Sequence, residues 1–222
     1  MLISYDRINF MSTNNKSEYN VIDAEAIGEY EEKKSKFIAH LMPVNSESEA
    51  VEYINQIKKK YYDARHNCTA MIIGENNELI RSSDDGEPQG TAGKPMLEVL
   101  TGAGLTNVVT VVTRYFGGVL LGTGGLVRAY QAAVKDALNN TRILTMSPCV
   151  NLAVNIPYSD VNSVQYFFGA ENIMITSSTY LADVTFEIRI LESSEQQVLT
   201  SLSELTKARA KCTRISAGFY PI

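Results

Sequence analysis

Residues 108–130 constrain the fold of this chain more than any other segment, and their sequence is VVTVVTRYFGGVLLGTGGLVRAY. The first five residues are apolar or β-branched, which is typical of a buried strand. Five glycines follow between Gly117 and Gly125, and a helical pattern begins at Leu126. Glycine allows positive φ and close approach of a ligand, and the first turn of a helix presents free N–H groups to an anion. The segment therefore predicts a strand, a glycine-rich loop and a helix that together form an anion pocket.

The spacing of these glycines differs from the two common nucleotide-binding signatures. A P-loop has Lys and then Ser or Thr directly after its second glycine, whereas Thr123 and Gly124 stand at those positions here. The dinucleotide pattern also fails, because no glycine follows Gly125 until Gly169. In the alternative interpretation the glycines serve tight turns and close packing of the helix on the strand, and both interpretations can hold together. The residues predicted to bind an anion or nucleic acid are Arg114, Tyr115, Gly117, Gly118, Gly122, Thr123, Gly124, Gly125 and Arg128.

Composition argues against several classes of partner. The net charge of −5 provides no overall basic surface, so we expect no DNA partner, and RNA contact would require a local basic patch. The three cysteines lie far apart without a C-x-x-C pair, and the chain has two histidines. We therefore predict no metal site and no cofactor. Sparse, odd-numbered cysteines favour a reducing, cytoplasmic location.

The N-terminal segment 1–20 is polar and lacks the apolar core of a signal peptide. We expect this segment to be disordered, and Met11 is an alternative start of translation. No stretch approaches the roughly 18 consecutive apolar residues of a membrane-spanning helix. The sequence therefore predicts no membrane partner.

Residues 21–145 are expected to form a first domain of mixed strands and helices. Two strands flank a charged turn predicted at Glu29–Lys34. Ser46 then precedes a helical pattern, with Glu49 at the capping-box position. Three lysines, Lys58 to Lys60, end this helix, where their charge complements the helix dipole.

A β-hairpin is predicted over residues 67–83, followed by a polar loop rich in turn-forming residues. A short helix is predicted over Pro95–Leu100, with Pro95 at its first position. The helix of the glycine motif is expected to end near Asn139. Residues 146–222 are predicted to follow the order β-α-β-β-α-β, which indicates a second domain of ferredoxin-like fold.

The loop at 83–93 places three carboxylates, Asp84, Asp85 and Glu87, within four positions. Such groups can bind a divalent cation or act as a general acid and base, with His66 as a second base. One alternative is that Asp84 and Asp85 form turn hydrogen bonds through their own side chains. Another is that the loop binds a partner or ligand. Cys68 alternates with apolar residues, which predicts a buried core position rather than a nucleophile.

Arg114 precedes two aromatic residues, Tyr115 and Phe116. On an exposed surface this arrangement can stack bases and hold phosphates. The alternative is that Phe116 belongs to the core and that Arg114 pairs with a loop carboxylate such as Asp84 or Asp85. The sequence leaves both interpretations open.

Four segments together resemble the Impact family, also called the YigZ family. They are KSKFIA from Lys34, RHNCTA from Arg65, SDDGEPQGTAGKPML from Ser83 and VTRYFGGVLLGTGGLVRAY from Val112. The resemblance implies an α+β chain of two α/β-sandwich domains. The first would have the second-domain fold of small-subunit ribosomal protein five, a four-stranded sheet with helices on one face. The second would be ferredoxin-like and similar to the last domain of elongation factor G.

The eukaryotic relatives implied by this resemblance regulate translation in the amino-acid starvation response and act by protein binding. We therefore expect a translation-associated regulatory factor that binds RNA, the ribosome or a translation-related protein and performs no chemistry. One alternative is a hydrolase-like enzyme acting on a small phosphorylated or metal-bound substrate through the 83–93 carboxylates. Another is a regulator that acts through protein interactions alone.

Overall fold

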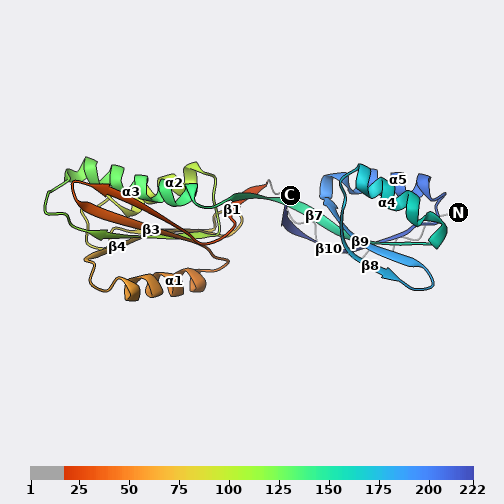
Figure 1. Ribbon diagram of the computed structural model, residues 1–222, viewed down its shortest axis with the longest axis horizontal. Coiled ribbons are helices and arrows are strands. Elements are labelled where there is room, and N and C mark those ends of the chain that lie inside the picture. The colour runs from red at the N-terminus through yellow and green to blue at the C-terminus, as the bar shows by residue number, and fades with distance from the viewer. Residues whose placement is uncertain (1–17) are drawn as a thin grey trace. The chain divides into compact units, whose positions relative to one another are not determined.

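The structure is a computed structural model that describes residues 18–222 (Figure 1). The predictions of disorder over residues 1–17 and of a start at Met11 lie outside the described residues. Tyr19 and Asn20, which the predicted disordered segment included, belong to strand β1 (Tyr19–Ile22). The chain divides into two compact units between Met146 and Ser147.

The N-terminal unit contains a five-stranded antiparallel sheet in the order β2-β3-β6-β4-β5. Its outer position is filled by β5, the second strand of the predicted hairpin, so the expected four-stranded sheet is wrong by one strand. The strands are β2 (Ala26–Glu32), β3 (Ser35–Pro43), β4 (His66–Ile73), β5 (Leu79–Ser83) and β6 (Val108–Tyr115).

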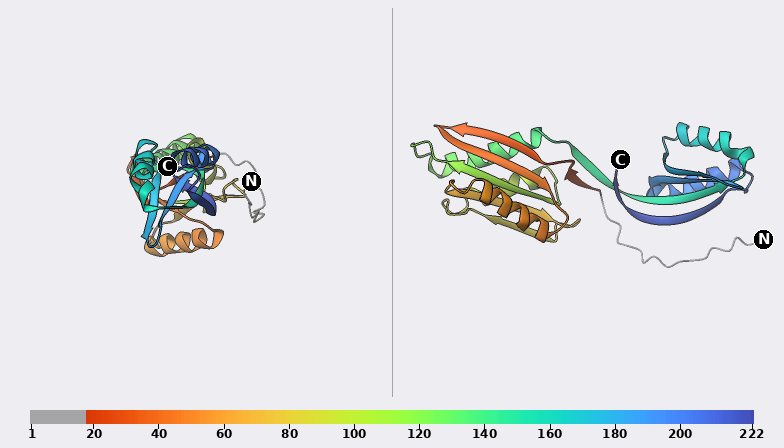
Figure 2. Two further views of the ribbon diagram at one scale, coloured as in Figure 1. Left: turned by 90° about the vertical axis from the view of Figure 1, so that its right-hand side faces the viewer. Right: turned by 60° about the horizontal axis from the view of Figure 1, so that its bottom comes forward.

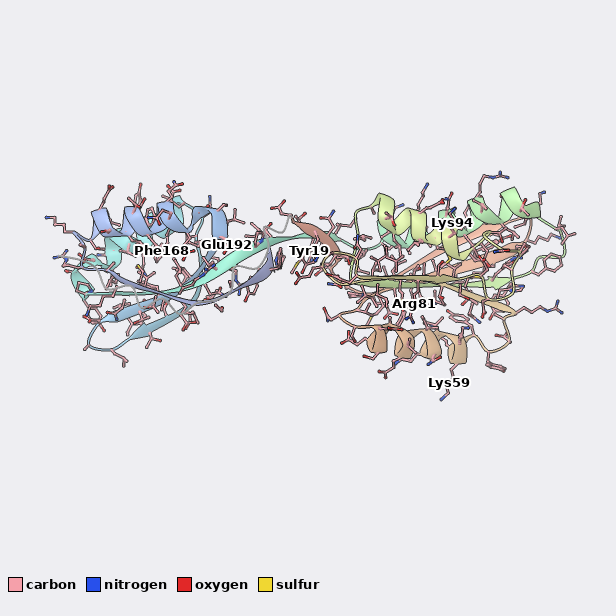
Figure 3. All side chains as sticks on the ribbon, turned by 180° about the vertical axis from the view of Figure 1, so that it is seen from behind. Tyr19, Lys59, Arg81, Lys94, Phe168 and Glu192 are labelled. Carbon is pink, nitrogen blue, oxygen red and sulfur yellow. The ribbon has the colours of Figure 1, made fainter. Side chains whose placement is uncertain are left out.

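Helices cover both faces of this sheet, which corrects the expectation of helices on one face (Figure 1). Helix α1 (Glu47–Lys60) lies on one side, and α2 (Gly93–Gly102) and α3 (Gly122–Asn139) lie on the other. Figure 3 shows Lys59 of α1 and Lys94 of α2 on opposite sides of the sheet. The sequence of β6 fits this arrangement, because Val108 to Val112 are all apolar or β-branched and a strand buried on both faces has no polar alternation.

Side chains of β6 divide between two cores. Val109 and Val111 pack with residues of α1, whereas Val108 and Val112 pack with residues of α2 and α3. Tyr130 of α3 is the largest fully buried side chain and contacts Phe37 edge-on, with ring centroids 5.1 Å apart. The sheet is therefore a fixed platform between two helical layers.

The predicted helix cap at Ser46 is confirmed. The Ser46 hydroxyl accepts a hydrogen bond from the Glu49 N–H, and the Glu49 carboxylate accepts one from the Asn45 N–H. The charged turn predicted at Glu29–Lys34 is too long, because β2 continues to Glu32. The turn consists of Lys33 and Lys34, and both residues have positive φ.

Two predicted helix starts are wrong. Helix α2 begins at Gly93 rather than Pro95, and α3 begins at Gly122 rather than Leu126. Glycine has low helix propensity, so the sequence pattern assigned both first turns to loops. Half of the predicted glycine loop is therefore the exposed first turn of α3. No helix among residues 18–222 is long and apolar enough to cross a bilayer.

The C-terminal unit has the strand order β10-β7-β9-β8, with α4 and α5 on one face (Figure 1). This order follows from the predicted β-α-β-β-α-β sequence and confirms the α+β class with a ferredoxin-like arrangement. Phe168 and Phe186 meet edge-on in its core, and Figure 3 shows Phe168 between helix and sheet. The elements are β7 (Ile143–Ile156), α4 (Val161–Ala170), β8 (Met174–Tyr180), β9 (Val184–Leu191), α5 (Glu195–Leu205) and β10 (Lys211–Pro221).

Candidate functional site

The four segments that carry the family resemblance meet at one end of the N-terminal sheet. Antiparallel pairing brings Lys36 opposite Tyr115 and His66 opposite Arg114. The views in Figures 1 and 2 agree that the β2–β3 turn and the loop before α3 lie at this same end. We call this surface the loop end and define it as residues 33–34, 61–65, 84–92 and 116–125, together with Arg128.

A buried polar cluster lies beneath the loop end, with Glu87 at its centre. The Arg114 guanidinium donates to Glu87 Oε1 at 2.7 Å, and the Tyr130 hydroxyl donates to the same oxygen at 2.8 Å. The side chains of Arg114 and Glu87 are only 8% and 3% exposed. Gly86 has a positive φ of 87°, which turns the chain so that Glu87 enters the unit.

This geometry corrects the predicted pairing of Arg114 with Asp84 or Asp85. Both aspartates already have other partners, and Glu87 is the carboxylate that reaches the end of β6. Arg114 is therefore not available on the surface as a phosphate ligand. The structure supports the interpretation in which Arg114 pairs with a loop carboxylate, but that carboxylate is Glu87 rather than Asp84 or Asp85.

Asp84 caps helix α2. Its carboxylate accepts hydrogen bonds from the N–H groups of Gly90, Ala92 and Gly93 at 2.7–3.0 Å. Burial raises the pKa of this carboxyl, but these backbone hydrogen bonds outweigh burial and lower the pKa below its ordinary value. The N-terminus of α2 therefore already holds an anion from its own chain.

Asp85 joins its loop to two elements, α1 and β4. Its carboxylate accepts from Lys58 at 2.8 Å and from the Asn67 N–H at 2.7 Å, while its carbonyl lies 2.9 Å from His66 Nδ1. Burial raises the pKa of Asp85, and the hydrogen bonds from Lys58 and Asn67 more than reverse that effect. Lys58 therefore binds the Asp85 carboxylate in addition to complementing the dipole of α1.

The three loop carboxylates consequently have three separate sets of internal partners. Within the described part of the chain, no group of three or more His, Cys, Asp or Glu side chains is placed to hold a metal ion. The convergence that metal binding or acid–base catalysis would require at Asp84, Asp85, Glu87 and His66 is not seen.

Cys68 is fully buried, as the strand pattern predicted. Its thiol lies 3.0 Å from the Asp84 carbonyl oxygen and 3.3 Å from the Tyr130 hydroxyl. Burial raises the pKa of the Cys68 thiol to about 12. The sulfur therefore remains protonated at neutral pH and acts as a packing and hydrogen-bonding group.

The glycines of the motif have different roles. A Cβ on Gly117 would lie 2.1 Å from the carbonyl carbon of Lys34, so only glycine fits between β3 and this loop. Gly118 and Gly122 have positive φ. Gly124 has neither constraint, because the nearest atom to a methyl group added there would be Arg128 Nη1 at 3.6 Å. Turn geometry and packing therefore explain part of the motif but leave Gly124 unexplained.

The first turn of α3 is exposed and positively polarised. Among the described residues no side chain caps this helix, and its first turn contains no acidic residue. Gly122, Thr123 and Gly124 are exposed, whereas Gly125 is buried. Arg128 extends back toward this turn, and Lys34 lies against Gly117 in the neighbouring hairpin.

Exposed apolar and aromatic side chains share the loop end with these charges. Phe116 is 55% exposed, Leu120 is 82% exposed and Tyr62 is 85% exposed. The Tyr115 hydroxyl donates to Asp63 at 2.8 Å and so connects the loop at 61–65 with β6. Sequence reasoning missed Tyr62, although a Tyr-Tyr pair directly after three lysines was a usable signal.

Comparisons with known proteins match both units. The Impact N-terminal domain matches residues 33–138, and a domain of unknown function, DUF1949, matches residues 154–209. IMPACT family member YvyE of Bacillus subtilis is 38% identical over 178 residues, which are 80% of this chain and 82% of that protein. IMPACT family member YigZ of Escherichia coli is 33% identical over 79% of this chain and 87% of its own length.

A solved structure, described as the crystal structure of a hypothetical protein, is also similar. It is 31% identical, with a TM-score of 0.57, over 90% of this chain and 98% of that one. Both domains of the family are thus present in the expected order, and relatives at this identity extend over most of both chains. The chain belongs to the Impact family.

Proposed function

We propose that this protein is a cytoplasmic, translation-associated regulatory factor that binds RNA through the loop end of its N-terminal unit. Membership of the Impact family supports the association with translation, as the sequence resemblance led us to expect. The observation that carries RNA binding is the exposed, uncapped first turn of α3, which the Arg128 side chain approaches and which follows a loop packed against the β2–β3 turn at Lys34.

The electrostatics of α3 favour a bound anion. The N-terminus of a helix carries a partial positive charge, and a cation beside it costs about 0.3–1 kcal/mol unless a negative group is present. Here Arg128 adds positive charge, whereas at α2 the carboxylate of Asp84 supplies the negative group. A phosphate bound at the N-terminus of α3 would supply the negative charge that the Asp84 carboxylate supplies at the N-terminus of α2.

Binding accounts for the loop end better than catalysis does. Asp84, Asp85 and Glu87 are engaged in capping and ion pairs, and the Cys68 thiol is buried and protonated. These groups fix the loops in position, and the exposed side chains of the loop end include lysines, arginines, aromatic rings, Val119 and Leu120, together with the Asp63 carboxylate. Such a combination contacts phosphates and bases.

Measuring how the affinity for ribosomal RNA and tRNA depends on salt tests the proposal. We expect the logarithm of affinity to fall linearly with the logarithm of salt concentration. Arg128→Ala and Lys34→Ala should each weaken binding and reduce the slope by roughly one. Lys135→Ala, at an exposed position farther along α3, serves as the control and should change neither quantity. Binding that is absent or independent of salt would refute the proposal.

A second candidate function is regulation through a translation-related protein partner. The exposure of Leu120, at 82%, favours this alternative because a large apolar side chain has no role in phosphate binding. A pull-down from host lysate at low and high salt separates the two functions. A protein captured without RNA, and lost in Leu120→Ser, would favour the second.

A further inference from the structure

The Phe116 ring lies over the buried guanidinium of Arg114, while much of the Phe116 side chain stays exposed to solvent. The Arg114 guanidinium carbon lies 5.7 Å from the Phe116 ring centroid and 5.5 Å from that of Phe37. Phe37 is fully buried, whereas Phe116 is 55% exposed. Arg114 therefore supports the Phe116 ring from inside the unit rather than contacting a ligand directly.

The support beneath this ring is rigid. Glu87 holds Arg114 through a 2.7 Å ion pair, and Tyr130 holds Glu87 from α3. Directly after Phe116 in the chain, the backbone of Gly117 packs tightly against Lys34, and its N–H donates to the Ser35 hydroxyl at 3.1 Å. A ring fixed before binding loses little conformational entropy when a ligand stacks on it.

Resting on the proposed RNA-binding function, we propose that the loop end binds single-stranded rather than duplex RNA, with Phe116 stacking on an unpaired base. In a duplex the base faces are covered by their neighbours, so an aromatic side chain can stack only on bases that are splayed out. The exposed N–H groups of the first turn of α3, which begins at Gly122 a few residues farther along the chain, would receive the adjoining phosphate.

A second exposed aromatic side chain lies on the loop end, where a bound RNA strand would pass it. Tyr62 is 85% exposed on the loop joined to β6 by the Asp63–Tyr115 hydrogen bond. Lys33, Lys34 and Arg128 are exposed around α3 and the β2–β3 turn, which suits a polyanion. Aromatic rings interleaved with cations are the usual features of a single-strand groove.

The absence of tryptophan from the chain allows a direct test. Phe116→Trp would place the single indole at the proposed stacking position. We expect its fluorescence to be quenched by a single-stranded oligoribonucleotide and not by the same sequence in duplex form. Ile27→Trp is the matched control, because Ile27 is 45% exposed near the opposite end of the β2–β3 hairpin. Its fluorescence should stay unchanged.

Phe116→Leu tests the energetic part of the proposal. Since stacking contributes measurably per base, we expect single-strand affinity to fall roughly five- to 150-fold without a change in salt slope. Thermal unfolding verifies that this variant is folded. Equal or tighter binding to duplex, unquenched Phe116→Trp, or unchanged affinity of Phe116→Leu would overturn the stacking proposal while RNA binding stands. Failure of the unaltered protein to bind either form would overturn both.

Discussion

Glu87 and Arg114 form a buried ion pair, with 2.7 Å between Glu87 Oε1 and Arg114 Nη1. The pair joins the loop at 84–92 to the end of β6, and both side chains are nearly inaccessible to solvent. Arg114 Nε has no hydrogen-bond partner among the described residues, so Glu87 is the main compensation for the buried charge. The pair therefore holds the loop in place at the end of the sheet.

Removing one member of this pair should be strongly destabilising. We expect Glu87→Gln to lower the free energy of unfolding by about 3–5 kcal/mol, because an uncompensated guanidinium would stay buried. The double variant Glu87→Gln/Arg114→Met should be less destabilised than the sum of the single variants. Urea denaturation of all four proteins gives the coupling energy. Additive losses would show that the two charges do not depend on each other.

The capping role of Asp84 predicts a dependence on acid pH. Asp84→Ala removes the acceptor for three N–H groups and should cost about 0.5–2 kcal/mol at neutral pH. Because the folded pKa of Asp84 is lowered, its stabilisation is present above the ordinary value of 3.8 and is lost as pH falls through the folded pKa. Denaturation measured from pH 7 to pH 2 should show the two proteins converging at the acid end. A constant difference would contradict this role.

His40 predicts a separate effect nearer to neutral pH. Its Nε2 lies 3.0 Å from the Tyr61 hydroxyl, and its Nδ1 has no partner among residues 18–222. Burial first, and then the charge of Lys60, lower its pKa, against an opposing effect of Glu25. The unfolded chain therefore binds more protons below the ordinary value of 6.5, and folded stability should decrease as pH falls through that range.

The decrease from His40 should not exceed about 1.4 kcal/mol for each pH unit. We expect His40→Gln to flatten the stability profile between pH 6.5 and the lowered pKa. His66→Gln is the natural control, since the chain has only two histidines. Equal flattening in both variants would assign the effect to another group.

Two glycines of the motif should respond oppositely to alanine. Gly117→Ala forces a methyl group to within 2.1 Å of the Lys34 backbone, so β3 or the loop must shift, at a cost of roughly 1–3 kcal/mol. Gly124→Ala meets only Arg128 Nη1, at an ordinary contact distance of 3.6 Å, in a helical turn and should stabilise by about 0.5–1 kcal/mol. If α3 binds phosphate, the same methyl group should also reduce RNA affinity. Chemical denaturation and RNA titration of both variants provide the comparison.

Sequence patterns predicted most of the elements because those elements depend on local chemistry. Ser46 caps the helix that follows it through its own hydroxyl, and the turn-forming residues 75–78 separate the two strands of the hairpin. The first turns of α2 and α3 were missed for the same local reason, since their glycines are poor helix formers. The strand order of the C-terminal unit also followed from the order of its elements.

The partners of the charged side chains were beyond the reach of the sequence. Asp84, Asp85 and Glu87 are close neighbours in the chain, yet they contact α2, α1 and β6 respectively, because each peptide unit turns the next side chain in a new direction. The presence of helices on both faces of the N-terminal sheet was likewise not predictable, because it depends on which face α1 folds back to cover.

The sequence by itself determined the family, the α+β class and the segments that matter. The tertiary structure alone decided that Arg114 is buried beneath Phe116 while the first turn of α3 is exposed. The physical reason is that burial and ion pairing arise from contacts between residues far apart in the chain. Arg114 and Glu87, separated by 27 positions, become partners only when β6 and the loop meet.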